Sequence, residues 1–386
     1  MSPAHRPLLW AEVDLGALRR NLRRVRRAAA GRAHAAPPEV LAVVKADAYG
    51  HGMRRVALAL SGEGVRSFGV ASLEEALELR AACRSARILV LGGFHDSQAE
   101  RLARAAITPS LSSFEDAERF AARLPRRMRV PYPVHVKVDT GMGRFGVWHE
   151  EAPQVFRKLA RRAPRLYVEG IYTHFSSADT DDAFTLNQLD LFERAAAAAL
   201  EAGLRPVYFH AANSLGIMRF GRSHLNLIRP GLVLYGLNPM GERGGRAPLG
   251  DLEPVMSLRT RIAFLKDVGK GRTLSYGATH RTAGPTRIAT LPVGYSHGYR
   301  IAFSNKAFVG VRGRRCRVVG RVTMDHTLVD VGGVPGVRRW DPVTLIGRDG
   351  RTAVSAEELA GIASTIPYEI VCAVHSRIPR VYKGIK

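Results

Sequence analysis

Residues 41–91 read LAVVKADAYGHGMRRVALALSGEGVRSFGVASLEEALELRAACRSARILVL, and this stretch decides the fold. Three short apolar runs, at 41–44, 68–70 and 88–91, alternate in it with segments long enough to form helices. Ser72 and Glu75 have the spacing of a capping box, which predicts that a helix begins after the second run. Such alternation is typical of parallel strands joined by crossover helices.

The same alternation continues on both sides of this stretch, from residue 10 to about residue 235. Further apolar runs lie at 134–138, 168–172, 207–209 and 225–228, and a weaker one lies at 108–111. Residues 182–202 predict a long alanine-rich helix that Gly203 ends. Eight runs over about 220 residues suit a closed (β/α)8 barrel.

The sequence changes in character after residue 240. Residues 241–246, GERGGR, suggest a flexible link. Beyond them, short segments rich in valine, threonine and glycine are separated by turn signals, and one late helix is expected near 355–362. We therefore expect an α/β protein with a (β/α)8 TIM-like barrel domain at 1–240, followed by a C-terminal β-rich domain at 241–386.

The charge balance is strongly basic, with 58 Lys and Arg against 34 Asp and Glu, a net charge of +24. The arginines are scattered along the chain, and no zinc-finger spacing, basic heptad region or RNA-binding signature accompanies them. We therefore expect a solvated basic surface without a specific nucleic-acid site. Nucleic-acid binding stays open as an alternative that only the charge suggests.

The cysteines and the apolar runs bear on location. Cys83, Cys316 and Cys372 are too far apart for a metal site and odd in number, so neither a disulfide framework nor a bound metal is expected. The N-terminal residues lack a secretory pattern, and no apolar run approaches the ~20 residues that span a bilayer. These features predict a cytoplasmic protein without a membrane partner.

Lys45 stands at the end of the first quoted run, where a charged group is costly without a partner or a chemical role. Burial lowers the pKa of a lysine and makes its amine available as a nucleophile or Schiff-base former. In a barrel, Lys45 would sit at the C-terminal mouth, where barrel enzymes carry their catalytic groups. A lone strand-end lysine is more often a surface residue, so its neighbours decide.

Six motifs supply that context. Residues 44–52, VKADAYGHG, resemble the cofactor-lysine motif of alanine racemases, and 137–146, KVDTGMGRFG, resemble a second signature of that family. THF at 173–175, HAANS at 210–214, RPGLVLYG at 229–236 and LSYGAT at 274–279 follow in the order of the family. The resemblance covers nearly the whole chain.

The resemblance implies a pyridoxal 5'-phosphate (PLP) enzyme that interconverts L-alanine and D-alanine, supplies D-alanine for cell-wall peptidoglycan, and works as a homodimer with shared active sites. Lys45 would hold the cofactor through its amine and act as one base. Tyr276 would reach in from the partner subunit as the other. Two groups on opposite faces can remove one proton and deliver another without moving the substrate.

The same resemblance implies the remaining contacts. Arg229 would donate to the pyridine nitrogen of PLP without giving up its own proton, which should limit side reactions, and His174 would bond Arg229 from behind. Further residues expected at the cofactor are Tyr49, Arg144, Asn213, Ser214, Gly231, Leu232 and Tyr368; those expected at the substrate are Arg144, Tyr295 and Met324. Lys137, close to Arg144, is expected to be carbamylated, as in some family members.

Part of this assignment has independent support. Asn213 and Ser214 follow the seventh apolar run, and Gly231 and Leu232 follow the eighth. Barrel enzymes often bind phosphate in these two loops. The positions of the residues along the chain therefore agree with the cofactor that the resemblance implies.

Alternatives of different kinds remain. Thr323 and the pair Ser296-His297 depart from the usual family residues, so a broader racemase acting on serine, lysine or arginine is the nearest one. A decarboxylase of related fold would need an acidic group at the PLP nitrogen, where Arg229 is expected. A PLP carrier protein would consist of the barrel alone, without the β-rich part and Tyr276.

Overall fold

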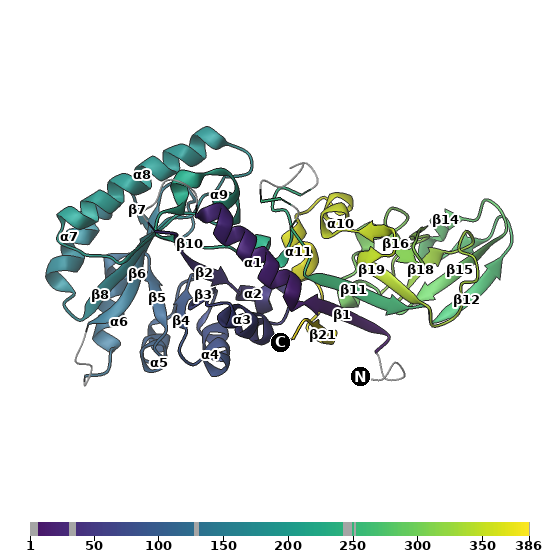
Figure 1. Ribbon diagram of the computed structural model, residues 1–386, viewed down its shortest axis with the longest axis horizontal. Helices are drawn as coiled ribbons and strands as arrows, with labels where there is room; N and C mark the ends of the chain where they lie inside the picture. The colour runs from purple at the N-terminus through teal and green to yellow at the C-terminus, as the bar shows by residue number, and fades with distance from the viewer. Residues whose placement is uncertain (1–6, 31–35, 127–130, 242–248, 251, 386) are drawn as a thin grey trace.

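The computed structural model describes residues 7–30, 36–126, 131–241, 249–250 and 252–385. Figure 1 shows a barrel at one end of an elongated molecule and a β-rich part at the other. The expected link at 241–246 lies, apart from Gly241, outside the described residues.

The barrel confirms the strand prediction. Eight parallel strands form one sheet in the order β10-β2-β3-β4-β5-β6-β8-β9, and its two end strands approach each other, so the barrel is nearly closed. The weak run at 108–111 is the strand β5. The strands are β2 (Glu39–Val43), β3 (Ser67–Val70), β4 (Arg87–Val90), β5 (Thr108–Leu111), β6 (Tyr132–Asp139), β8 (Leu166–Tyr172), β9 (Tyr208–His210) and β10 (Leu227–Ile228), and β7 (Val147–Trp148) pairs with β6.

Helices surround the barrel because each buries one apolar side against the strands. In α1, the stripe of Leu15, Leu18, Leu22 and Val25 is buried. The predicted long helix is α8, which ends at Glu201; Ala202 caps it, and the next residue, Gly203, has a left-handed φ of 89°. The helices are α1 (Leu15–Ala29), α3 (Met53–Gly62), α4 (Leu73–Ala82), α5 (Ala99–Arg104), α6 (Phe114–Arg123), α7 (Ala152–Arg162), α8 (Asp182–Glu201) and α9 (Ser214–Arg219), with short turns η2 (Asp96–Gln98), η3 (Gly221–His224) and η4 (Leu232–Tyr235).

The β-rich part contains one large sheet, a three-stranded sheet and a hairpin. The large sheet runs β17-β16-β19-β11-β1-β21, and β20 pairs with β19; the smaller ones are β12-β15-β18 and β13-β14. The elements are β11 (Met256–Arg261), β12 (Phe264–Val268), β13 (Thr273–Leu274), η6 (Tyr276–Ala278), β14 (His280–Arg281), β15 (Thr286–Leu291), η7 (Tyr295–His297), η8 (Ile301–Phe303), β16 (Phe308–Val311), β17 (Arg314–Arg317), β18 (Thr327–Asp330), β19 (Pro342–Asp349), β20 (Thr352–Val354), α10 (Ala356–Ile362), α11 (Pro367–Cys372) and β21 (Arg380–Lys383).

The N-terminal strand departs from the expected division of the chain. β1 (Leu9–Asp14) pairs antiparallel with β11 and parallel with β21, so it belongs to the large sheet of the β-rich part. A division of the chain at residue 240 therefore puts β1 with the barrel, although this strand belongs to the large sheet of the β-rich part. One hydrophobic core runs through both parts, which fixes them to each other.

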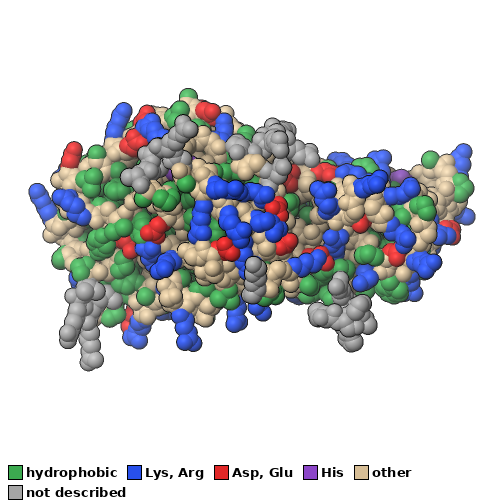
Figure 2. Space-filling model, in the orientation of Figure 1, with side chains coloured by type: hydrophobic (Ala, Val, Ile, Leu, Met, Phe, Trp, Pro, Cys, Tyr) green, Lys and Arg blue, Asp and Glu red, His purple; other side chains and the backbone are tan. Residues whose placement is uncertain are grey.

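The charged side chains are scattered over the surface, as their distribution along the sequence predicts. Figure 2 shows Lys and Arg side chains spread over the whole visible face, with Asp and Glu among them. Arg20 and Arg24 of α1, for example, both pair with Glu253. No helix within the described residues has the length and apolar character needed to cross a membrane.

Candidate active site

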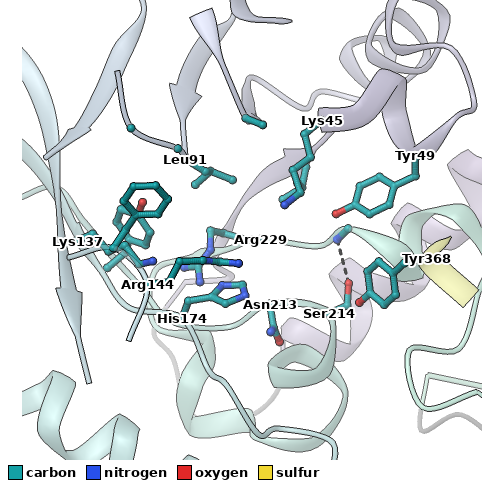
Figure 3. A pocket seen from close by; sticks show the side chains of 17 residues that line it. Lys45, Tyr49, Leu91, Lys137, Arg144, His174, Asn213, Ser214, Arg229 and Tyr368 are labelled. Carbon is teal, nitrogen blue, oxygen red and sulfur yellow. Dashed lines mark hydrogen bonds between the residues drawn. The ribbon is translucent and has the colours of Figure 1, made fainter. Parts of the chain in front are cut away.

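A cavity of about 490 Å³ opens at the C-terminal mouth of the barrel. Figure 3 shows Lys45 and Arg144 pointing into it from opposite sides. The predicted residues that line it are Lys45, Tyr49, Lys137, Arg144, His174, Asn213, Ser214, Arg229, Gly231 and Tyr368; the others are Val43, Ala71, Leu91, Gly92, Gly93, Phe145 and Tyr172. The fold thus brings together groups from both halves of the barrel and from α11.

Lys45 lies two residues after the end of β2 and, among the described residues, is one of two lysines that line the cavity. Burial and the Arg144 guanidinium lower the pKa of Lys45, and the Glu75 carboxylate partly opposes this effect. The next four residues, Ala46 to Tyr49, all have φ between 51° and 55°, the left-handed region. Left-handed backbone costs about 1–2 kcal/mol for each residue with a side chain, so the surrounding structure must hold this turn in place.

Glu75 and Asp47 hold the turn. One oxygen of Glu75 accepts from the backbone N–H of Ala46 and the other from that of Ala71, each at 2.7 Å. Asp47 accepts from the N–H of Met53 at 2.7 Å. Ser72 caps α4 as predicted, but Glu75 reaches across to the lysine turn instead of bonding back to Ser72. Sequence reasoning missed this role because the capping pattern explained Glu75 locally.

One side of the cavity lies where the loops after the seventh and eighth barrel strands meet. The Gly231 N–H donates to the Ser214 hydroxyl at 3.0 Å, and Asn213 caps α9 by accepting from Gly216. A Cβ on Gly231 would lie 2.7 Å from the Tyr49 hydroxyl oxygen, so only glycine leaves this space open. Hydroxyl and backbone donors around an open space suit a phosphate group.

Arg229 lines the cavity but is only 3% exposed, and its terminal N–H groups are hydrogen-bonded to the protein. Nη1 donates to His210 Nδ1 at 2.9 Å and to the His210 carbonyl at 2.8 Å, and Nη2 donates to the carbonyls of Thr173 and Ala211. Within the described residues, no group accepts a hydrogen bond from the Arg229 Nε–H and no carboxylate pairs with this guanidinium. Burial lowers the pKa of Arg229 to about 10, so it stays protonated at neutral pH.

The prediction that His174 bonds Arg229 is wrong. The histidine on Arg229 is His210, the last residue of β9, while His174 lines the cavity itself. Both histidines follow or end barrel strands, so the sequence alone did not distinguish them. Burial and nearby cations hold the pKa of His174 well below its usual range, so it is neutral at pH 7.

Asp139 shapes the loop that carries Arg144. Its carboxylate accepts from the backbone N–H groups of Gly141, Met142 and Arg144 at 2.9, 2.8 and 3.2 Å. Lys137 lies nearby and is 3% exposed. Burial, with Arg144 and Arg229, lowers the pKa of Lys137 to about 8. A larger fraction of this amine is therefore neutral near physiological pH than for an ordinary lysine, although the protonated form still predominates.

Buried histidines should make stability depend on pH. Burial lowers the pKa of His51 to about 4, and it holds those of His174 and His210 well below the usual range. The unfolded chain takes up protons near pH 6.5, so stability is full above that pH and falls below it, by up to about 1.4 kcal/mol per pH unit and histidine. Urea unfolding at about pH 7 and pH 5 should show this loss. Equal free energies of unfolding at the two pH values would contradict this prediction. As a control, replacing exposed His95 by asparagine should leave the pH dependence of stability unchanged.

Four predicted residues do not line the cavity. Tyr276, Tyr295 and Met324 lie in the β-rich part, and their exposed fractions are 71%, 42% and 54%. Backbone bonds from Tyr295 to the Thr323 carbonyl and from the next residue to the Met324 carbonyl join two of these loops. Leu232 is fully buried directly after Gly231. Figure 1 places β14, which follows Tyr276, at the end of the molecule away from the barrel.

Comparisons with known proteins point to the same family along nearly the whole chain. The family model for the alanine racemase N-terminal domain matches residues 13–239, and that for the C-terminal domain matches 255–382. The chain is 44% identical to the alanine racemase of Symbiobacterium thermophilum over 379 residues, covering 97% of both chains. It superposes on the structure of alanine racemase from Streptomyces lavendulae with a TM-score of 0.90 at 33% identity, covering 99% and 98%. For alanine racemase from Bartonella henselae with covalently bound pyridoxal phosphate, the TM-score is 0.85 at 29% identity, covering 98% and 100%.

Proposed function

Because this chain belongs to the alanine racemase family and is an enzyme of that family, we propose that it interconverts L-alanine and D-alanine with PLP, using Lys45 and the Tyr276 of a second copy as opposed proton carriers. One observation carries the proposal: a lysine with a lowered pKa shares a barrel-mouth cavity with the hydroxyl groups of Ser214 and Tyr49 and with two guanidinium groups. The test is formation of D-alanine from L-alanine by the purified protein.

The residues of the cavity fit the cofactor. The space kept open by Gly231, beside Ser214, Tyr49 and Tyr368, would hold the phosphate, and Lys45 would hold the aldehyde carbon. The Nε–H of Arg229 would donate to the ring nitrogen. When bound, PLP weakens the Cα–H bond of an attached amino acid by drawing electron density into its ring. The relative from Bartonella henselae carries this cofactor covalently, which supports the assignment.

The chain's own groups would then bind the substrate and move the proton. A lysine with a lowered pKa is more often deprotonated, so the Lys45 amine can accept a proton from the substrate α-carbon. Arg144 would hold the substrate carboxylate with its planar fork of donors. Neutral His174 adds no charge to a cavity that already holds two guanidinium groups.

The second proton carrier would come from a second copy of the chain. Tyr276 is mostly exposed and does not line the cavity of its own chain. We place Tyr276, with Tyr295 as a gate and Met324 near the substrate carboxylate, at the cavity of the partner in a homodimer. The D-alanine formed would supply cell-wall peptidoglycan, in the cytoplasm.

Alanine should be preferred over larger substrates. At the expected gate, the Ser296 hydroxyl lies 2.8 Å from the Met324 carbonyl oxygen and 3.0 Å from Asp325 Oδ1, and its one hydrogen can be donated to either, so this polar side chain is already satisfied within the chain. We expect kcat/KM for L-alanine to exceed that for L-serine, L-lysine and L-arginine by at least about tenfold, since fit in a small pocket discriminates at this level. A preference for a basic amino acid would instead establish the broader racemase.

Lys137 should carry a carbamate. Its pKa of about 8 makes the neutral amine available to carbon dioxide, and an anionic product would lie beside Arg144 instead of a like charge. Protein supplied with ¹³C-bicarbonate should therefore show a carbamate carbon signal that disappears in Lys137→Arg. A wild-type spectrum without this signal, at the same bicarbonate concentration, would refute the modification.

A further inference from the structure

A line of polar side chains crosses the buried interior of the barrel behind the active site. It begins at Arg229, whose Nη1 donates to His210 Nδ1 at 2.9 Å. His210 Nε2 lies 2.9 Å from His135 Nδ1 on β6, and His135 Nε2 faces a Glu169 carboxylate oxygen on β8 at 3.5 Å. Both imidazoles are buried, with exposed fractions of 0% and 3%, so water does not supply alternative partners.

The direction of donation fixes both histidine tautomers. The guanidinium can only donate, so His210 must accept at Nδ1 and carry its hydrogen on Nε2. That hydrogen points to His135 Nδ1, which must accept, so His135 carries its hydrogen on Nε2 as well. This last N–H faces Glu169. All donors therefore point the same way, from the cavity toward the carboxylate.

The packing leaves the two imidazoles little freedom to turn. The Tyr172 ring stacks on His210 with ring centres 4.7 Å apart and planes 9° apart. Gly170, next to Glu169 in β8, gives His135 its space: a Cβ there would lie 2.4 to 2.8 Å from three atoms of the imidazole. A single strand thus provides both the carboxylate and the gap that the ring occupies.

The line ends at the barrel floor, opposite the active site. Glu169 has a side-chain exposure of 19% and borders a small cavity of about 20 Å³ with His135, Arg87 and Tyr208. Arg87 is committed to Tyr208 and to Glu39, with the Glu39 contact at 2.7 Å. Glu169 is therefore the carboxylate that faces His135. Glu39 is a carboxylate of the same floor, but it pairs with Arg87.

We propose that Glu169, His135 and His210 are positioning residues for Arg229, which hold its Nε–H toward the cofactor and balance its buried charge from the far end of the barrel. The role at the cofactor rests on the proposed function. A buried cation is expensive without a counterion, and a line of hydrogen bonds in a low-dielectric interior that ends facing a carboxylate is polarised along its length. This arrangement leaves the cofactor ring free of an adjacent carboxylate.

Three variants of the full-length enzyme separate charge from hydrogen bonding. Glu169→Gln keeps an acceptor for His135 but removes the charge, Glu169→Leu removes both, and Glu39→Gln is the matched control on the same floor. The ¹⁵N resonances of labelled histidines report the tautomers directly, whatever the activity. Racemisation rate and the visible absorption of bound PLP report the effect at the cavity.

In the wild type, His135 and His210 should both carry hydrogen on Nε2. Glu169→Gln should keep this pattern, and Glu169→Leu should disturb it at both histidines. We expect Glu169→Leu to lower kcat about 10- to 100-fold, by analogy with the loss of hydrogen bonds that support the ligands of metal sites, with a shifted PLP absorption band. Glu39→Gln should stay within about twofold of the wild type in kcat.

Two outcomes would overturn the proposal. Tautomers and PLP absorption in Glu169→Leu that equal those of the wild type would show that the line does not act on Arg229. Equal losses in Glu39→Gln and Glu169→Leu would assign both to general weakening of the barrel floor. Failure of the proposed function would look different, because a wild type without racemase activity could still show the two predicted tautomers.

Discussion

Lys45→Ala is expected to lose the visible absorption of bound PLP and to lower racemisation of alanine by at least about 10³-fold, because it removes both the covalent attachment and one proton carrier. Absorption spectra and a D-alanine assay measure the two effects. Lys270→Ala, at an exposed position, is the control and should behave as the wild type. Retention of the band and of activity in Lys45→Ala would refute the assigned role of this lysine.

Tyr276→Phe should keep the visible absorption but lower conversion of L-alanine by about 10²–10⁴-fold, the usual contribution of a positioned acid–base group. Phenylalanine preserves the ring and removes only the hydroxyl that would move the proton. In deuterated water, this variant should still exchange the α-proton of D-alanine through Lys45 while exchange of L-alanine fails. Equal loss with both enantiomers would contradict a one-sided role for Tyr276.

Mixing the two inactive variants tests whether the sites are shared. If Tyr276 serves the partner's cavity, a mixed dimer has one cavity with both native groups and one with neither. Random exchange between equal amounts should then restore about a quarter of wild-type activity per site. Two inactive variants that stay inactive after exchange, verified by a tag on one of them, would place both groups in one chain.

The barrel was predictable because each of its strands is an apolar run between amphipathic helices. Even the weak run at 108–111 forms a strand, β5. The N-terminal strand was not, because nothing local in residues 9–14 shows that their partners are β11 and β21. The short helix α11 was also missed, since six residues give no clear periodicity.

The site, like the fold, was predictable only in part. The sequence motifs predicted that Lys45, Arg144 and Arg229 share one cavity, because strand ends meet at the mouth of a barrel. The left-handed turn after Lys45 could not be predicted, since its alanine, aspartate and tyrosine residues do not favour that backbone, and the distant Glu75 helps hold it. Likewise, the choice between His174 and His210 depends on which ring faces Arg229 in space.

The position of β1 has a consequence for how the protein is made. Trp10 pairs with Arg259, roughly 250 positions later in the chain, and Val13 pairs with Tyr382 near the end. During synthesis, β1 therefore has no neighbour until the chain has been made as far as β11, and its second neighbour, β21, comes later still. A nascent chain halted after the barrel would present an unpaired strand edge, a site at which incomplete chains associate, so ribosomal stalling there should favour aggregation.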